Sequence, residues 1–226
     1  TGQLLDMPAI TAAGHESGAL VGFDLAHAAG NVPLALHDWN VDFAAWCSYK
    51  YLNCGPGAVG GVFIHERHVR DTECIRYGGW WGNDPDTRFN MHSETAFDPV
   101  KSADAWQLSN PPIFSLAPMI ASLAIFDECG MERLRAKSRV LTGYLHFMLR
   151  EHLQETSEVI TPSNSEERGC QISVRLYDRP RERFDALASH GIHADFRTPD
   201  IIRLAPTPLY NTFEDCHKTA EVLGSI

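Results

Sequence analysis

The sequence predicts an α/β fold, in which helices cover both faces of a parallel or mixed sheet. One observation is that short apolar runs bounded by Gly and Asp, which are typical of buried strands, alternate with stretches of helical periodicity. The composition, with 44% hydrophobic and 21% charged residues, is usual for a globular protein and therefore agrees with such a fold. A length of 226 residues suffices for one large domain or two small ones with a buried core.

The first part of the chain contains three expected strands, at residues 19–23, 43–48 and 61–64, which follow an expected helix around residues 8–17. Each strand is short and apolar, as in a sheet that is buried on both faces. Residues 72–112 show no clear period and are rich in Gly, Trp, Asp, Asn and Pro. So long an irregular segment is more often functional than a simple connection.

Helical periodicity then dominates, and the pattern changes again after residue 153. Helices are expected at 115–127 and 132–153, the second with an apolar stripe along one face. Further along we expect strands at 159–160, 170–176, 193–196 and 201–204, and helices at 181–189 and 213–223. The chain is therefore expected to divide into residues 1–114, connecting helices over 115–153, and a small α+β domain over 154–226.

Charge and cysteine usage exclude several classes of protein. The formal net charge is −10, which argues against a general nucleic-acid binder, and the absence of a long apolar run argues against a membrane span. The six cysteines are scattered without a CxxC pair, which favours reduced thiols in a cytoplasmic protein. Since the His and Cys residues lack metal-ligand spacing, no metal site is expected.

The run from Gly55 to Gly60 satisfies the GxGxxG pattern of dinucleotide-binding proteins. That pattern functions only where the last glycine opens a helix that faces the pyrophosphate. Here Gly60 leads into the expected strand 61–64, and no acidic residue ends a strand about 20 positions later. We therefore expect these glycines to permit tight turns or a close approach of the backbone.

Lys50 and Asp24 form the most informative pair. Lys50 follows an apolar strand and is flanked by aromatic residues. Such surroundings lower the pKa of a lysine because burial disfavours the ammonium ion, and the neutral amine is the form that attacks carbonyl groups. Taken alone, Lys50 could extend to solvent and Asp24 could be a turn residue. Because both follow strands of one α/β sheet, they are expected to face the crevice where ligands bind. Pyridoxal phosphate (PLP) requires this pair, an acid for its ring nitrogen and a lysine for its aldehyde.

Several separated segments then resemble one family in the right order. The segments GFDLAHAAGN and DFAAWCSYKYLNCGPGAVGGVFIHE resemble the fold-type I, class V group of PLP enzymes, and within that group the kynureninase family. Further matching segments are GGWWGNDPDTRF, LSNPPIFS, LTGYL, ITPSNSEERGCQISV and IRLAPTPLYNTFED. The resemblance implies a PLP-dependent transferase fold of type I, with residues 1–114 as the second half of the large-domain sheet and residues 154–226 as the small C-terminal domain.

The resemblance also implies roles for residues near the cofactor. Lys50 would be the Schiff-base lysine, and Asp24 would pair with the pyridinium nitrogen, with His27 close to the cofactor. Tyr49 would hydrogen-bond the phosphate and is a second candidate catalytic residue, as an acid–base group. His27 could instead be an ordinary structural histidine. Four other histidines are expected to be surface residues: His15, His65, His68 and His92.

Three further residues are assigned by the resemblance to cofactor or substrate. Trp80 and Asn110 would contact the cofactor or the substrate, and Arg203 would hold the substrate carboxylate. Arg203 interrupts an apolar strand, which is costly unless its guanidinium meets a carboxylate. The alternative partner is an internal acid such as Asp195. Either Trp80 or its neighbour Trp81 could serve packing alone, and Asn110 could be a turn residue.

The activity implied by the resemblance is hydrolysis of L-kynurenine or 3-hydroxy-L-kynurenine to L-alanine and the matching anthranilate, in tryptophan catabolism. A homodimer with the site at its interface is implied as well. Enzymes of this kind carry a long stretch before the GFDLAH strand that cradles the phosphate, so we expect this chain to be a C-terminal portion that alone lacks full PLP affinity. Two alternatives stay open: another class V PLP enzyme, such as an aminotransferase or cysteine desulfurase, or a non-catalytic half-subunit that needs a separate N-terminal chain.

Overall fold

The computed structural model describes residues 1–71 and 73–225, and the chain forms two compact units. The first, here the N-terminal unit, consists of Met7–Ala29 and Leu34–Ile125. The second, here the C-terminal unit, consists of Thr1–Asp6, Gly30–Pro33 and Phe126–Ile226. Because Thr1–Asp6 and Gly30–Pro33 group with the C-terminal unit, the two units are not two continuous stretches of chain. The domain division expected from the sequence stays a prediction.

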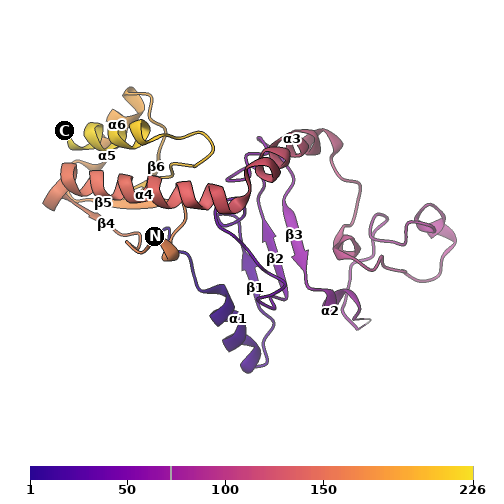
Figure 1. Cartoon of the computed structure of the whole chain (residues 1–226). Helices are drawn as coiled ribbons and strands as arrows, with labels where there is room; N and C mark the ends of the chain where they lie inside the picture. The colour runs from indigo at the N-terminus through magenta and orange to yellow at the C-terminus, as the bar shows by residue number, and fades with distance from the viewer. Residues whose placement is uncertain (72, 226) are drawn as a thin grey trace. The chain divides into compact units, whose positions relative to one another are not determined.

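The N-terminal unit is built on a three-stranded mixed sheet with strand order β1-β2-β3 (Figure 1). β1 and β2 are parallel, whereas β2 and β3 are antiparallel, so the prediction of a parallel or mixed sheet is confirmed. The elements are α1 (Met7–Glu16), β1 (Gly22–Asp24), β2 (Phe43–Trp46), β3 (Gly61–Ile64) and α2 (Glu66–Val69).

Strand β1 is shorter than predicted because the residues before it use their backbone groups elsewhere. The N–H of Ala19 donates to the carbonyl of Gly14 at 3.0 Å, and the N–H of Val21 donates to the Asp42 carboxylate at 2.6 Å. The strand begins at Gly22, and Asp24 is its last residue.

The expectation that both faces of this sheet are buried is wrong within this chain. Phe43 and Val62 are 48% and 49% exposed, while Ala44, which points to the opposite face, is buried. A short apolar run does not distinguish a strand covered on both faces from one covered on a single face, since both lack polar alternation.

Residues 72–112 are largely irregular where the structure describes them, as predicted. Two short 3₁₀ helices, η1 (Arg88–Ser93) and η2 (Ala103–Trp106), and an isolated bridge between Asn83 and Pro99 are the regular features of this segment.

The helix α3 (Ile113–Cys129) follows, and its last residues enter the C-terminal unit. That unit holds a four-stranded antiparallel sheet of order β4-β5-β7-β6. Its elements are α4 (Met131–Leu153), η3 (Gln154–Thr156), β4 (Ser157–Val159), η4 (Ser165–Glu167), β5 (Ile172–Leu176), α5 (Pro180–Ser189), β6 (Asp195–Arg197), β7 (Ile201–Leu204) and α6 (Phe213–Gly224). The small α+β arrangement expected for this part of the sequence is confirmed.

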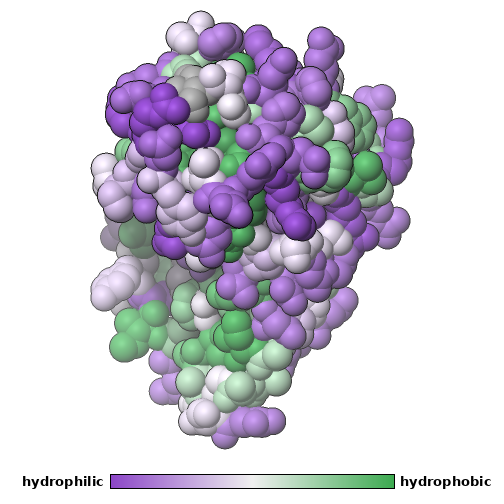
Figure 2. Space-filling view, turned by 90° about the vertical axis from the view of Figure 1, so that its left-hand side faces the viewer, coloured by the Kyte–Doolittle hydropathy of each residue, from purple (hydrophilic) through white to green (hydrophobic). Residues whose placement is uncertain are grey.

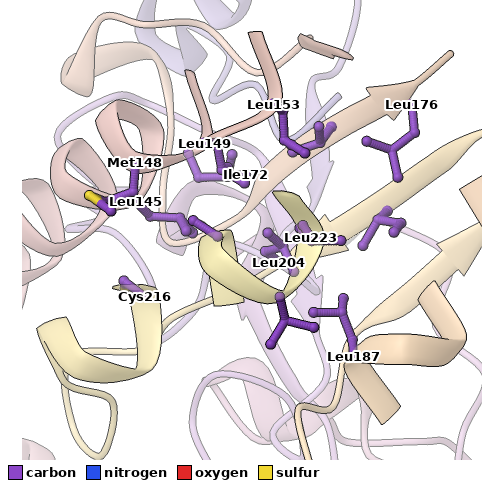
Figure 3. Close-up of a cluster of buried hydrophobic side chains, with 14 of the residues drawn as sticks. Leu145, Met148, Leu149, Leu153, Ile172, Leu176, Leu187, Leu204, Cys216 and Leu223 are labelled. Atoms are coloured by element: carbon purple, nitrogen blue, oxygen red, sulfur yellow. The ribbon is translucent and has the colours of Figure 1, made fainter. Parts of the chain in front are cut away.

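The core of the C-terminal unit lies between its helices and one face of the sheet (Figure 3). Alternate residues of β5 and β7 point into it, while Arg203, between two inward-facing residues, points to the other face. The most buried side chains, each at most 2% exposed, are Leu141, Leu145, Leu149, Leu153, Ile172, Val174, Leu176, Leu187, Ile202, Cys216, Ala220 and Leu223.

Apolar side chains also remain on the surface, some of them on the face drawn in Figure 2. Along α3, Ile113, Phe114 and Ile120 are 75%, 95% and 74% exposed.

Among the described residues, no single helix has the length and apolar character of a membrane span. Helix α3 and the helix after it meet these criteria only when taken together, and that pair is bent by 80°.

Candidate active site

Asp24 and Lys50 belong to neighbouring segments of the N-terminal unit's sheet. Asp24 is the last residue of β1, and Lys50 follows the end of β2 by four residues. Because the two strands are parallel, with Asp24 opposite Ala45, their carboxyl ends lie at the same edge of the sheet. The exposed Asp24 carboxylate accepts a hydrogen bond from the N–H of Ala26 at 2.8 Å. The fold therefore brings the two predicted cofactor segments to one edge.

The loop after β2 holds Lys50 by its backbone. The hydroxyl of the buried Ser48 donates to the carbonyl of Val59, and the N–H of Asn53 donates to the carbonyl of Lys50 at 3.0 Å. Asn53 has a φ of 55°, which closes a tight turn directly after the lysine. The half-buried Lys50 places its Nζ 5.9 Å from the centre of the Tyr49 ring.

The glycines after this loop serve turns and close packing, as predicted. Gly55 and Gly57 have φ values of 88° and 74°, which L-residues with side chains rarely adopt. A Cβ on Gly60 would lie 2.7 Å from the carbonyl oxygen of Trp46, and one on Gly61 would overlap the Trp46 ring. Since strand β3 follows at Gly61, the dinucleotide interpretation fails on structure as well.

Tyr49 and His27 both lie among aromatic or polarisable neighbours. Tyr49 is 51% exposed, and a hydrogen bond with the Cys47 side chain raises the pKa of its phenol. The exposed His27 ring packs edge-on against Tyr51, with 6.0 Å between ring centres. Both side chains are accessible for a ligand contact, and their cofactor roles remain predictions.

Trp80 and Trp81 point to different partners. The Trp80 ring is perpendicular to that of Phe89, with 5.6 Å between centres, whereas Trp81 stacks on the guanidinium of Arg88 at 4.6 Å. Trp80 remains 43% exposed and is the more accessible of the two. Asn110 is exposed in the turn before α3. Contacts of Trp80 and Asn110 with cofactor or substrate remain predictions.

Arg203 lies in the C-terminal unit, on the polar face of its sheet. It pairs in register with Ser173 on β5 and Asp195 on β6. Its Nε donates to Asp195 Oδ2 at 2.5 Å, so the internal ion pair considered from the sequence is present. Burial alone would raise the pKa of Asp195, but the hydrogen bond and charge of Arg203, together with Arg197, lower it overall. A guanidinium has five N–H donors, so this bond leaves donors for a substrate carboxylate.

A buried ionic cluster that the sequence interpretation missed surrounds Asp42. Asp42 is 1% exposed and directly precedes β2, so it lies at the strand end opposite to Lys50. Its Oδ2 accepts hydrogen bonds from the N–H of Val21 at 2.6 Å and from His15 at 2.8 Å. Its Oδ1 pairs with Arg67 and accepts from His68 at 2.6 Å. Burial would raise the pKa of Asp42, but these hydrogen bonds outweigh it and lower that pKa strongly.

The expectation that His65 is a surface residue is wrong, because it is 8% exposed, whereas His15 and His68 are partly exposed and bound to Asp42. His92 is exposed, as expected. The sequence held one signal: Asp42 stands between Val41 and Phe43 in an apolar run, and a buried carboxylate requires partners.

Comparison with known proteins identifies the family. Residues 134–223 match the family described as Kynureninase C-terminal domain. Proteins named kynureninase from Flavobacterium psychrophilum and Myxococcus xanthus are 54% and 52% identical to the chain, each over 99% of its length. The chain carries a C-terminal domain of the kynureninase family, and its similarity to proteins of that name extends over almost its whole length. It spans about half the length of these relatives, 53% and 52% respectively, and carries the kynureninase C-terminal domain.

Solved structures support the fold independently of sequence. A cysteine desulfurase from Thermococcus onnurineus matches 99% of this chain with a TM-score of 0.78 at 16% identity, and the chain covers 56% of it. An alanine–glyoxylate aminotransferase from Nostoc matches the whole chain with a TM-score of 0.71 at 16% identity, with 58% of it covered. A cystine C–S lyase with glycine covalently linked to its PLP cofactor matches 87% of the chain with a TM-score of 0.67 at 19% identity, with 49% of it covered. The predicted PLP-dependent fold of type I is confirmed.

Proposed function

We propose that the protein carrying this chain is a kynureninase, which uses PLP to hydrolyse L-kynurenine or 3-hydroxy-L-kynurenine. The observation that carries the proposal is the 54% identity to a protein of that name across 99% of the chain. The class V alternatives, an aminotransferase or a cysteine desulfurase, are supported only by structural likeness at 16% identity, which speaks for the fold and not for the reaction.

The residues at the sheet edge fit PLP by their chemistry. Asp24 offers an exposed carboxylate to a protonated ring nitrogen, and Lys50 offers an amine from the loop after the adjacent parallel strand. Tyr49 offers an accessible hydroxyl to the phosphate, and His27 is exposed in the turn after Asp24. When bound, PLP supplies an electron sink for the charge left by bond breaking at the substrate.

The chain's own residues would then bind the substrate and move its protons. Lys50 would hold the cofactor through its amine and, once released, take the proton from the α-carbon of the amino acid. Asp24 would keep the ring nitrogen protonated through a charge-assisted hydrogen bond. Tyr49 would hold the phosphate. Tyr49 or Lys50 would return a proton to the carbon that becomes the methyl group of alanine, and Lys50 would return a proton to the α-carbon.

Arg203 would bind the α-carboxylate of the substrate, and Trp80 and Asn110 would line the site. One water is consumed at the carbonyl carbon next to the substrate's aromatic ring. The carbon–carbon bond between that carbonyl and the β-carbon breaks, which yields anthranilate or 3-hydroxyanthranilate and L-alanine.

We further propose a cytoplasmic homodimer with the site at its interface. The six cysteines are all free thiols, which suits a reducing compartment. The exposed apolar residues of α3, above all Phe114 at 95% exposure, are suitable for a subunit interface. Light scattering coupled to gel filtration tests the dimer.

The deciding experiment incubates the natural-length protein and PLP with L-kynurenine, 3-hydroxy-L-kynurenine or L-cysteine, and measures anthranilate fluorescence and alanine. We expect the wild-type protein to turn over a kynurenine. The Lys50→Ala variant should lose both this turnover and the absorbance of lysine-bound PLP. The matched control Lys101→Ala, which changes an exposed lysine, should retain both. Turnover of cysteine alone would favour a desulfurase. Activity that appears only after a separate N-terminal chain is added would favour the half-subunit.

A further inference from the structure

A short segment after the predicted cofactor residues belongs to the other unit. Asp24 and His27 are part of the N-terminal unit, whereas Gly30–Pro33 groups with the C-terminal unit. Within this segment Asn31 and Val32 are 8% and 3% exposed. A buried polar side chain needs hydrogen-bond partners, and those of Asn31 show what the segment is attached to.

Asn31 is bound to the chain just ahead of strand β5. Its Oδ1 accepts a hydrogen bond from the N–H of Cys170 at 2.8 Å. Its amide also lies against the α-carbon of Gly169, where a Cβ would overlap the Asn31 side chain. Residue 169 is thus a glycine because the Asn31 amide occupies the space of a side chain.

The other side of this contact is buried and hydrogen-bonded to α4. Cys170 is 1% exposed, and its sulfur lies 3.3 Å from the hydroxyl of Ser138 on α4. From the same helix, Arg135 donates to the carbonyl of Arg168 at 2.9 Å. Burial raises the pKa of the Cys170 thiol, which keeps it neutral and suited to packing.

The contact between Asn31 and residues 169–170 lies, in the sequence, between Asp24 and Arg203, two predicted functional residues. On one side, the turn that links Asp24 to Asn31 is well held: Leu25 and Ala29 are buried, and the N–H of Ala29 donates to the carbonyl of Leu25 at 3.0 Å. On the other side, β5 begins at Ile172, and its next residue, Ser173, pairs with Arg203.

We propose that Asn31 is a positioning residue, whose amide fastens the segment leading from Asp24 and His27 to the start of β5, and thereby to the sheet that carries Arg203. The inference rests on the proposed function for the roles of Asp24 and Arg203. It rests on the described contacts alone for the attachment itself. Loss of the Asn31 contact should loosen the turn over residues 25–30 and weaken binding of the substrate carboxylate.

The test breaks the contact from both sides, with Asn31→Ala and Gly169→Ala in the natural-length holoenzyme. Hydrogen exchange measured by mass spectrometry should rise about tenfold in peptides covering residues 25–30 and 170–173, as for the loss of one buried hydrogen bond. The KM for kynurenine should rise about tenfold with a smaller change in kcat, because carboxylate binding is affected more than the chemical step.

Two further variants make the result specific. Asn31→Asp keeps an acceptor for the Cys170 N–H and should restore most of the protection and of the KM. Thr142→Ala is the control, because buried Thr142 bonds only within α4 in the contacts described for its hydroxyl, to the carbonyls of Ser138 and Arg139. It should leave residues 25–30 and the KM unchanged.

Unchanged exchange over residues 25–30 in both Asn31→Ala and Gly169→Ala, or an equal rise in Thr142→Ala, would overturn the proposal. If the protein does not turn over kynurenine, the proposed function fails while the exchange experiment still decides the attachment. An exchange effect without any KM effect would overturn the positioning role.

Discussion

The two sheets of this chain are stabilised in different ways. In the C-terminal unit, helices α4, α5 and α6 cover one face, and side chains such as Leu149 and Ile172 are fully buried. In the N-terminal unit, the three-stranded sheet leaves Phe43 and Val62 about half exposed. In the structure described, a hydrophobic core closes one face of the C-terminal sheet, whereas the N-terminal sheet, which carries the predicted cofactor residues, keeps one face open and has the buried Asp42 cluster at one end of β2.

The charged groups repeat this contrast. Asp42 in the N-terminal unit is buried and is satisfied by a backbone N–H, an arginine and two histidines. Asp195 in the C-terminal unit is 45% exposed and pairs with arginines in the presence of water. A buried carboxylate that loses its charge leaves several donors unsatisfied, while an exposed pair is screened by solvent.

The largest effect is expected from Asp42→Asn, which should reduce the free energy of unfolding of the N-terminal unit by about 4 kcal/mol at pH 7. Since folding lowers the pKa of Asp42, its contribution is complete above the pKa of the unfolded chain, about 4, and declines as the pH falls below that value. The difference between wild type and variant should therefore shrink below about pH 4.

Denaturant titration by tryptophan fluorescence measures this change, because all five tryptophans lie in the N-terminal unit. The control is Asp38→Asn, which changes an aspartate with an 83% exposed side chain and should have little effect. Equal losses in the two variants would refute the role assigned to the Asp42 cluster.

A smaller but still large loss, about 3 kcal/mol, is expected for Leu149→Ala in the closed core of the C-terminal unit. The cavity left in a well-packed core adds to the lost transfer free energy. The loss should appear in the slowest-exchanging amides of α4 and β5, with little change in the tryptophan signal. Val140→Ala, on the same helix but 61% exposed, is the matched control and should change stability by less than about 0.5 kcal/mol.

The smallest effect is expected for Phe43→Ser on the exposed face of β2, at most about 0.5 kcal/mol in this chain. The adjacent Ala44 points to the buried face, so Ala44→Leu should cost about 2 kcal/mol by overpacking. Denaturant titration of both variants compares the two faces of one strand. A Phe43→Ser loss as large as that of Ala44→Leu would mean that the outer face is covered in solution.

Regular elements with a clear period were predictable from local pattern. Strand β3 has the predicted bounds, and α4 begins one residue before the predicted start. The glycine run was predicted to form turns because a strand, and not a helix, follows it. Strand β1 was misjudged at its start because the N–H of Val21 bonds to a side chain that is 21 residues away.

The resemblance to the kynureninases, the alternation of strands and helices, and the placing of Asp24 and Lys50 after neighbouring strands were all predictable before the structure was known. These depend on residue order and on side-chain periodicity along a single element. The packing of the elements was needed to show that Asp42 binds His15 and His68, that Arg203 bonds to Asp195, and that the Asn31 amide lies against Gly169. Each of these joins residues from different elements, and the partner of a buried polar group depends on how those elements pack.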